Sequence, residues 1–362
     1  MTGRPALLLA RLLRAPETDQ GHTPATWSAI LRCARHEGLA GALAHRLRET
    51  GRWNDVPDQV RAILRNAEID VAHGHTRATW RARGIGRLLR DVGCPLILLK
   101  GTAYVAAGRQ AANGRSAGDL DILVPRSWLG AVEARLADAG WRIVATDPYD
   151  IAYYRQWMHE LPPMVHETRG GELDVHHTIL PLTHRLRPDA AALVAAAQPL
   201  PDSDWRVLCP ADMVLHSAVH LFCDGEFTKG LRNLWDLHQL LMEFGRDRRF
   251  WDDLVTRARL HGLERPAAYA LRYTQRLFHT RVEAGALAAL RPALPDGAAR
   301  ALMDALVLTT LASAGPDTPG PAARAARFLL YVRAHWLKMP PALLARHLWT
   351  KWRMRRQGTR RG

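Results

Sequence analysis

The segment N-G-R-S-A-G-D-L-D-I-L-V-P, from Asn113 to Pro125, contains two motifs that predict different folds and different chemistry. Its first half has the G-x-S-x-G spacing of a serine-hydrolase nucleophile elbow, with Ser116 at the centre. Its second half has the D-x-D spacing of a metal-binding pair of carboxylates, Asp119 and Asp121. The elements on either side of the segment decide between the two.

A nucleophile elbow needs a strand before the serine and a helix after it. Here the order is reversed, because A-A-G-R-Q-A-A-N-G-R before Ser116 is not strand-like and D-L-D-I-L-V after it alternates as a strand does. On that strand Asp119 and Asp121 share one face and lie about 7 Å apart along the chain. Their carboxylates can therefore converge on two Mg²⁺ ions roughly 3.5–4 Å apart.

The pattern around the D-x-D pair predicts a mixed α/β region. P-L-I-L-L-K, ending at Lys100, suits a buried strand that runs into a turn and then a helix. Residues 127–139 predict an amphipathic helix, and W-R-I-V-A-T a third strand. M-V-H-E-T and E-L-D-V-H-H-T-I predict a hairpin that turns at Gly170-Gly171. Asp174, between apolar neighbours on the second arm of this hairpin, is the best candidate for a third metal-binding carboxylate.

Helical patterns flank this region on both sides. Apolar residues recur at intervals of three and four between Thr26 and about Leu89, and helix returns after Pro188. The segment from Ala314 to Pro321 has the composition of a linker. We therefore expect an α+β fold in which a small mixed β-sheet core is flanked by N-terminal and C-terminal helical regions. The expected divisions are residues 1–90, 91–187, 188–313 and 314–362.

Composition limits the compartment and the partners. The chain of 362 residues is 48% hydrophobic, which is enough for a sizeable core, and its four cysteines form no C-x-x-C pair, so a cytoplasmic location is the default expectation. No window suits a membrane-spanning helix. The net charge of +15 comes mostly from the C-terminal tail, because no acidic residue follows Asp317 whereas eleven Lys or Arg do.

Further residues suit an anionic substrate and its partner. Gly101 and Thr102 stand at a strand-to-helix turn, where free backbone N–H groups favour a phosphate, and Lys100 and Arg115 add positive charge. Alternation places His176 on the face of Asp174. The polar stripe Asp212, His216 and His220, together with Lys229, Arg232 and Asp236, is a candidate lining for an acceptor pocket.

Three motifs carry a resemblance to a known family. L-L-K-G-T-A-Y, R-S-A-G-D-L-D-I-L-V and E-L-D-V-H-H resemble the nucleotidyltransferase superfamily typified by DNA polymerase beta, and most of all a bacterial branch of uncharacterised nucleotidyltransferases. The similarity runs from about Trp27 to Met242. Thr102 replaces the usual serine of the Gly-Ser turn, and sixteen residues separate it from Asp119, an interval that suits this branch.

The resemblance implies a mechanism and a set of ligands. Asp119, Asp121 and Asp174 would bind two Mg²⁺ ions, and the turn at Gly101 and Thr102 would bind a nucleoside triphosphate, with ATP the first expectation. The positive charge of Lys100 and Arg115 suits the same triphosphate. A hydroxyl of an unidentified acceptor, whether a small molecule, a sugar or a peptide, would attack the α-phosphate and release pyrophosphate.

Two alternatives keep the same fold. One is a toxin-like nucleotidyltransferase that acts on tRNA or other RNA, and the other is a non-catalytic nucleotide-binding scaffold. The tail from Tyr331 to Arg356 interleaves aromatic and basic residues, which suits RNA or an anionic membrane surface. The sequence does not choose between these partners and an ordinary packed helix.

Overall fold

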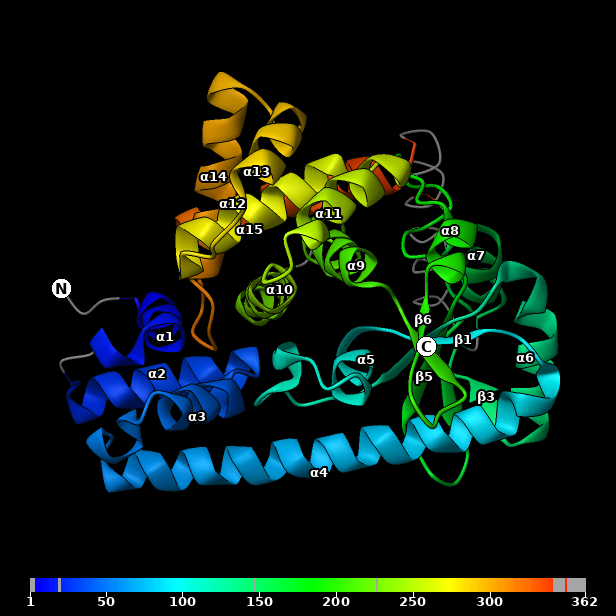
Figure 1. Ribbon diagram of the computed structural model, residues 1–362, viewed down its shortest axis with the longest axis horizontal. Helices are drawn as coiled ribbons and strands as arrows, with labels where there is room; N and C mark the ends of the chain where they lie inside the picture. Colours follow the sequence, from blue (N-terminus) through cyan, green and yellow to red (C-terminus); the bar gives the residue numbers. More distant parts are fainter. Residues whose placement is uncertain (1–3, 19–20, 146, 226, 341–348, 350–362) are drawn as a thin grey trace, which may run out of the picture.

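The computed structural model describes residues 4–18, 21–145, 147–225, 227–340 and 349. A mixed sheet lies at the centre of the sequence and helical regions flank it on both sides (Figure 1). This arrangement confirms the predicted α+β fold.

Helices before the sheet are α1 (Pro5–Arg14), α2 (Pro24–Glu37), α3 (Ala40–Glu49) and α4 (Asp58–Leu89). The strands are β1 (Leu96–Leu98), β2 (Leu120–Leu123), β3 (Trp141–Ile143), β4 (Met164–His166), β5 (Glu172–His176), β6 (Gln198–Pro199) and β7 (Trp205–Val207). Helices between strands are α5 (Lys100–Ala106), α6 (Leu129–Asp138), α7 (Pro148–Trp157) and α8 (Ala190–Ala195). Helices after the sheet are α9 (Pro210–Cys223), α10 (Gly230–Phe244), α11 (Arg249–Leu260), α12 (Glu264–Phe278), α13 (Ala284–Leu290), α14 (Gly297–Ala312) and α15 (Pro321–Lys338).

The sheet has the strand order β3-β4-β5-β2-β1-β7-β6. β2 pairs in parallel with β5 and antiparallel with β1, while β4 and β5 form the predicted hairpin. Gly170 and Gly171 in its turn both have positive φ, as the G-G motif requires. The apolar faces of these strands, including Leu120, Ile122 and Val175, are buried in the core.

The expected return to helix directly after Pro188 is wrong in part. β7 pairs in parallel with β1, and β6 extends the sheet beyond it. Trp205 and Val207 are buried on either side of the exposed Arg206, so the alternation of a strand is present. Three residues are too few for that period to stand out from the helical pattern around them.

Helix α4 is the base on which the other parts are placed. It has 32 residues and runs beneath both the N-terminal helices and the sheet (Figure 1). At 1.5 Å per residue it extends about 48 Å. It also holds the loop before β2: His75 Nε2 lies 2.7 Å from the Arg115 carbonyl oxygen, and Arg81 donates to the Gly118 carbonyl at 3.0 Å. The position of the D-x-D strand is thus fixed partly from α4.

Helix α3 contacts the same loop through two glycines. A side chain on Gly41 would meet the Gly114 carbonyl oxygen at 2.5 Å, and a side chain on Gly114 would meet the Ala42 nitrogen at 2.3 Å. Gly114 also has a φ of +70°, which other residues rarely adopt. The first glycine of the G-x-S-x-G motif therefore serves backbone packing.

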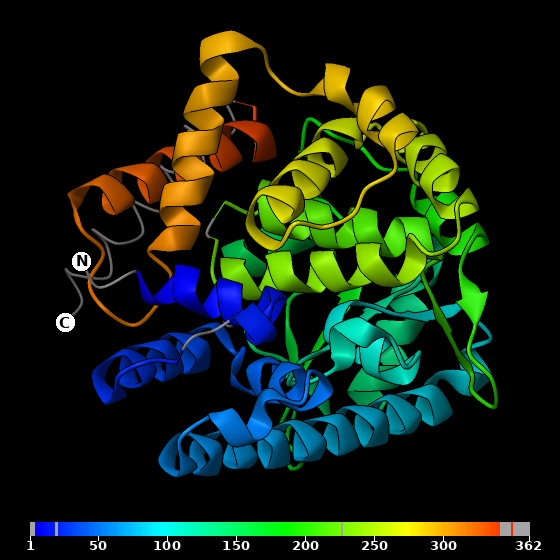
Figure 2. The ribbon, with the colours of Figure 1, turned by 60° about the vertical axis from the view of Figure 1, so that its left-hand side comes forward.

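The C-terminal helices are organised around α9, which packs against α10, α11 and α12. Figures 1 and 2 both show α9 and α10 between two groups of elements, with α11 and α12 on one side and α5 and α4 on the other. The predicted linker between Ala314 and Pro321 joins α14 to α15. Helix α15 includes the start of the basic tail, and beyond residue 340 only residue 349 of the tail lies within the described ranges. None of the described helices combines the length and the hydropathy of a membrane-spanning segment.

The two glycines of the G-x-S-x-G motif should differ in their effect on stability. Gly114→Ala forces an unfavourable φ and a clash with α3, so we expect it to destabilise the fold by at least about 1–3 kcal/mol. Gly118→Ala has no neighbouring atom within 4 Å and is the matched control, with an expected change near zero. Urea unfolding would measure both. Equal midpoints for the two variants would contradict the packing role of Gly114.

Candidate functional site

Two of the three predicted acids are placed side by side by the sheet. The parallel register of β2 and β5 sets Asp121 directly opposite Asp174. Neighbouring strands lie about 4.8 Å apart, so the two carboxyl groups share one small space. Asp119 immediately precedes β2 and is exposed, and it faces the same cavity.

Two cations or donors converge on Asp121. Lys100 Nζ donates to its Oδ1 at 2.6 Å, and His176 Nε2 lies 3.2 Å from the same oxygen. Burial alone would raise the pKa of Asp121, but Lys100 and His176 outweigh it and hold that pKa well below its usual range. Lys100 has a φ of 48°, an uncommon conformation for a residue with a side chain, at the start of α5. The ammonium group that contacts Asp121 is therefore carried by a residue with a strained backbone conformation.

Asp174 has the opposite electrostatic environment. Burial, and then the carboxylates of Asp121 and Glu160, raise the pKa of Asp174 to about 7. Lys100 and His176 oppose this rise without cancelling it. Such a pKa indicates that the protein groups leave negative charge uncompensated at this point.

Arg115 joins the sheet to the C-terminal helices. Its Nε donates to Asp236 of α10 at 2.7 Å, and both side chains are largely buried. Its guanidinium lies against Gly101, where a Cβ atom would come within 1.8 Å of Nη1. Gly101 is therefore needed for Arg115 to occupy this position, which is a different reason from the backbone approach to phosphate expected from the sequence.

These residues line a cavity of about 270 Å³. Eleven of the fourteen predicted site residues contribute to it: Lys100, Gly101, Arg115, Asp119, Asp121, Asp174, His216, His220, Lys229, Arg232 and Asp236. Sequence reasoning missed Tyr104, Ser217 and Asn233 of the lining. The spacing of α10 could have indicated Asn233, because residues 229, 232, 233 and 236 form one helical face.

A second cavity of about 370 Å³ adjoins the first and contains the twelfth predicted residue, His176. The two cavities share Lys100, Asp174, His216 and His220. Helix α15 contributes to the far side of the second cavity. The residues that it provides are Tyr331, His335 and Lys338.

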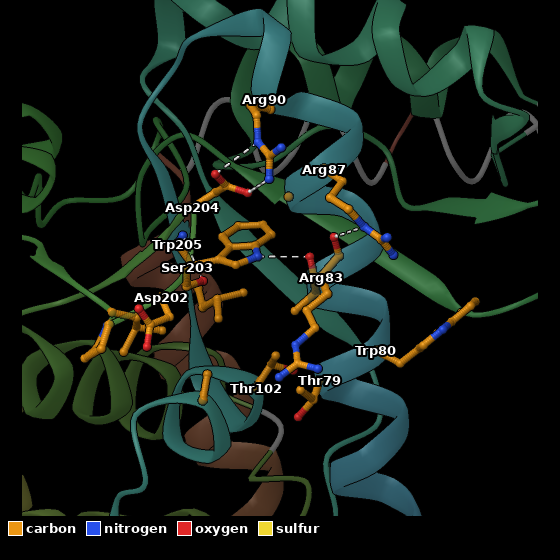
Figure 3. A pocket seen from close by; sticks show the side chains of 16 residues that line it. Thr79, Trp80, Arg83, Arg87, Arg90, Thr102, Asp202, Ser203, Asp204 and Trp205 are labelled. Atoms are coloured by element: carbon orange, nitrogen blue, oxygen red, sulfur yellow. Dashed lines mark hydrogen bonds and ion pairs between the residues drawn. The ribbon is translucent and has the colours of Figure 1, made fainter.

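Thr102 is placed differently from the other predicted residues. Its hydroxyl donates to the Asp119 carbonyl oxygen at 3.3 Å, and its side chain is buried. It lines a third cavity of about 690 Å³, between α4 and the turn before β7, together with Trp80 and Arg83 (Figure 3). Its hydroxyl thus supports the backbone at Asp119, and the part of Thr102 in a phosphate site stays a prediction.

The predicted polar stripe on α9 is divided between two environments. His216 lies between the first two cavities, and burial holds its pKa well below the usual value, so its ring is neutral. Asp212 points elsewhere, since it forms an ion pair with Arg257 and lies 3.3 Å from His261. Asp212 lies on α9 four residues before His216, but Arg257, 45 residues away in sequence, holds it in the helical core and it lines neither of these two cavities.

A protein-family model described as "uncharacterised nucleotidyltransferase" matches residues 23–279. The chain belongs to this family. The match confirms the resemblance drawn from the three motifs, and it supports nucleotidyl transfer as the general activity of this nucleotidyltransferase. No curated protein matches the chain. Helix α15, which reaches the second cavity, lies outside the matched residues.

The raised pKa of Asp174 makes the stability of the metal-free nucleotidyltransferase depend on pH. The folded-state pKa of about 7 lies above the ordinary 3.8, so the contribution of Asp174 to stability is fully present below pH 3.8 and is lost as pH rises through 7. Asp174→Asn cannot ionise. We therefore expect its advantage in unfolding free energy over the wild type to grow between about pH 4 and 7, by up to about 1.4 kcal/mol per pKa unit, and then to level off.

Thermal unfolding in the presence of a chelator would measure this difference at several pH values. Asp138→Asn, which removes an exposed carboxylate of α6, is the matched control. An advantage of Asp174→Asn that stays constant from pH 4 to 8 would contradict the raised pKa.

Proposed function

We propose that the chain is a Mg²⁺-dependent nucleotidyltransferase that transfers a nucleoside monophosphate from a nucleoside triphosphate, ATP first among them, to a hydroxyl of an acceptor. The observation that supports this most directly is the meeting of Asp119, Asp121 and Asp174 at a cavity that is also lined by basic side chains. Family membership supports the general reaction.

The charges of the first cavity suit a metal-bound triphosphate. Four basic side chains (Lys100, Arg115, Lys229 and Arg232) and four acidic ones (Asp119, Asp121, Asp174 and Asp236) line it. Their formal charges cancel. Two divalent cations would add four positive charges, which a nucleoside triphosphate with roughly four negative charges would neutralise. Either the two cations or the triphosphate alone would leave a net charge in the cavity. We therefore expect the metal ions and the triphosphate to bind cooperatively.

Two of the four basic residues of this cavity, Lys229 and Arg232, lie where positive charge is locally in excess. The positive charge of Arg232 lowers the pKa of Lys229, and burial followed by Arg115 lowers the pKa of Arg232. Among the described residues, no carboxylate lies within ion-pair distance of Lys229 or Arg232. A polyphosphate would relieve this repulsion, so we assign its binding to Lys229, Arg232 and Arg115.

The three acids offer only carboxylate oxygens, which are the ligands that Mg²⁺ prefers. The uncompensated negative charge at Asp174 supports this assignment. When bound, Mg²⁺ would neutralise phosphate charge and lower the pKa of an attacking hydroxyl. Asp119, Asp121 and Asp174 would hold the ions, and Lys100 would balance Asp121.

The second cavity is the candidate acceptor site. Asp174 lines both cavities, so an acceptor hydroxyl approaching from the second cavity would reach the triphosphate beside this carboxylate. Helix α15 contributes Tyr331, His335 and Lys338 to the far side of this cavity, where they could contact the acceptor. The size of the cavity favours a small molecule, a sugar or a peptide end.

An RNA acceptor receives less support from the described part of the tail. Arg327, Arg333 and Lys338 of α15 bond to Ser313, Phe222 and Asp224 of the same chain. These side chains support packing of α15 on the protein. Other tail cations, such as Arg346 and Lys351, lie outside the described residues.

Metal-dependent pyrophosphate release tests the proposed reaction. With ATP and a panel of hydroxyl acceptors, or labelled ATP and total RNA, Asp121→Asn should lower the rate by about 100-fold or more, because it removes a charge that acts on the transferred group. Ser116→Ala, in the loop before the strand, should retain most activity. A folded wild type with neither ATP binding nor pyrophosphate release would refute the enzyme. A biological activity that survives Asp119→Ala and Asp121→Ala would instead favour the scaffold.

Gly101→Ala tests the position of Arg115. The added methyl group would displace the guanidinium, so we expect ATP affinity to fall at least about tenfold while the three acids remain in place. Gly84→Ala in α4 has open space around the new methyl group and should bind ATP like the wild type. Isothermal titration calorimetry would compare the two. Unchanged affinity in Gly101→Ala would exclude Arg115 from the triphosphate site.

A further inference from the structure

Three potential metal ligands meet on the wall of the second cavity. His159 and Glu160 follow α7, and His176 ends β5. The backbone holds the two segments in register, because residues 160 and 176 form an antiparallel bridge and the His177 N–H donates to the His159 carbonyl at 2.8 Å. The relative position of the three side chains is therefore fixed by main-chain contacts.

The distances within this group suit a single ion. One oxygen of Glu160, Oε2, lies 3.3 Å from His176 Nδ1 and 3.7 Å from His159 Nε2. One ligand atom from each of the three residues lies within 4.8 Å of the others. Nitrogen and oxygen atoms bound about 2.0–2.1 Å from a tetrahedral ion are separated by roughly 3.3 Å. The two separations that involve Glu160 are close to this value.

The two ring nitrogens of His176 face different carboxylates. Its Nε2 lies 3.2 Å from Asp121, a partner that needs the Nε2 proton. Its Nδ1 is buried and faces Glu160 Oε2 at 3.3 Å without a hydrogen bond. Nδ1 of His176 and the Glu160 carboxylate are therefore positioned to bind the same cation.

We propose that His159, Glu160 and His176 bind one divalent transition-metal ion of the Zn²⁺ class, with an open coordination position toward the second cavity. Two imidazoles and a carboxylate favour such ions, whereas the all-oxygen set of Asp119, Asp121 and Asp174 favours Mg²⁺. The carboxylate of Asp121 would orient His176 in the way that acidic groups orient metal-bound histidines. This site does not depend on the proposed nucleotidyl transfer.

The open position gives the ion a role in ligand binding. The cavity around it, of about 370 Å³, is lined by further polar groups that include His220, His335 and Lys338. An oxygen or nitrogen atom of a small ligand could complete the coordination, as water or substrate does in three-ligand zinc sites. The chemical class of ligand that this predicts is a small molecule with a metal-binding hydroxyl, carboxylate or amine group.

Metal titration of the full chain, free of any purification tag and stripped with a chelator, tests the site. We expect one Zn²⁺ per chain and, with Co²⁺ as the spectroscopic probe, the intense visible bands of a four- or five-coordinate ion. His159→Ala and Glu160→Gln should each weaken binding by at least about 100-fold. His73→Ala, on the exposed face of α4, is the matched histidine control and should bind like the wild type.

Asp119→Asn distinguishes binding at this site from binding at the three acids. It changes one of the proposed Mg²⁺ ligands and should leave Co²⁺ binding unchanged. Circular dichroism would verify folding, and Glu160→Gln keeps the side-chain shape if His159→Ala does not fold. Failure to bind Zn²⁺ or Co²⁺ at micromolar concentration, or wild-type binding in both ligand variants, would overturn the proposal. Equal loss in Asp119→Asn would place the ion on the acids instead. NMR evidence that His176 carries both ring protons in the presence of Zn²⁺ would also overturn it.

Discussion

The parallel pairing of β2 with β5 is the constraint on which the site depends. It forces Asp121 and Asp174 into adjacent positions, where burial and mutual repulsion oppose the ionisation of both. The surrounding groups stabilise the ionised form of one carboxylate more than that of the other. Lys100 and His176 converge on Asp121 and keep it ionised, whereas Asp174 keeps a raised pKa. The negative charge of Asp121 is thus neutralised by groups of the protein, whereas ionised Asp174 would be stabilised by an additional cation.

Two close contacts at glycines connect the helices to this sheet. Gly114 lets the loop before β2 touch α3, and Gly101 lets Arg115 lie across the start of α5 and reach Asp236 on α10. The first contact positions the acids, and the second links them to the helix that carries Lys229. The cavity therefore joins parts of the chain that are distant in sequence, and glycine provides the space at each junction.

The sequence predicted those features that depend on local periodicity. The alternation in D-L-D-I-L-V and the hairpin pattern around the G-G turn were sufficient to predict the two strands that carry Asp121 and Asp174, since each pattern continues for several residues. The sequence could not predict the role of Gly101 or the pairing of Asp212 with Arg257, because long-range contacts decide both. It also could not predict strand β7, which has only three residues. The cluster at His159 was missed for the same reason, as it lies in a loop and meets β5 only through the tertiary fold.

The position of Lys100 suggests how the two proposed ligands of the first cavity would affect each other. Its ammonium group occupies Oδ1 of Asp121, the oxygen that a metal ion would also approach. A bound cation would repel this ammonium group, and a triphosphate in the same cavity would attract it. Under the proposed function, Lys100 would therefore move from carboxylate to phosphate as metal and nucleotide bind together. Since Lys100 also lines the second cavity, its movement would change the surroundings of the acceptor at the same time.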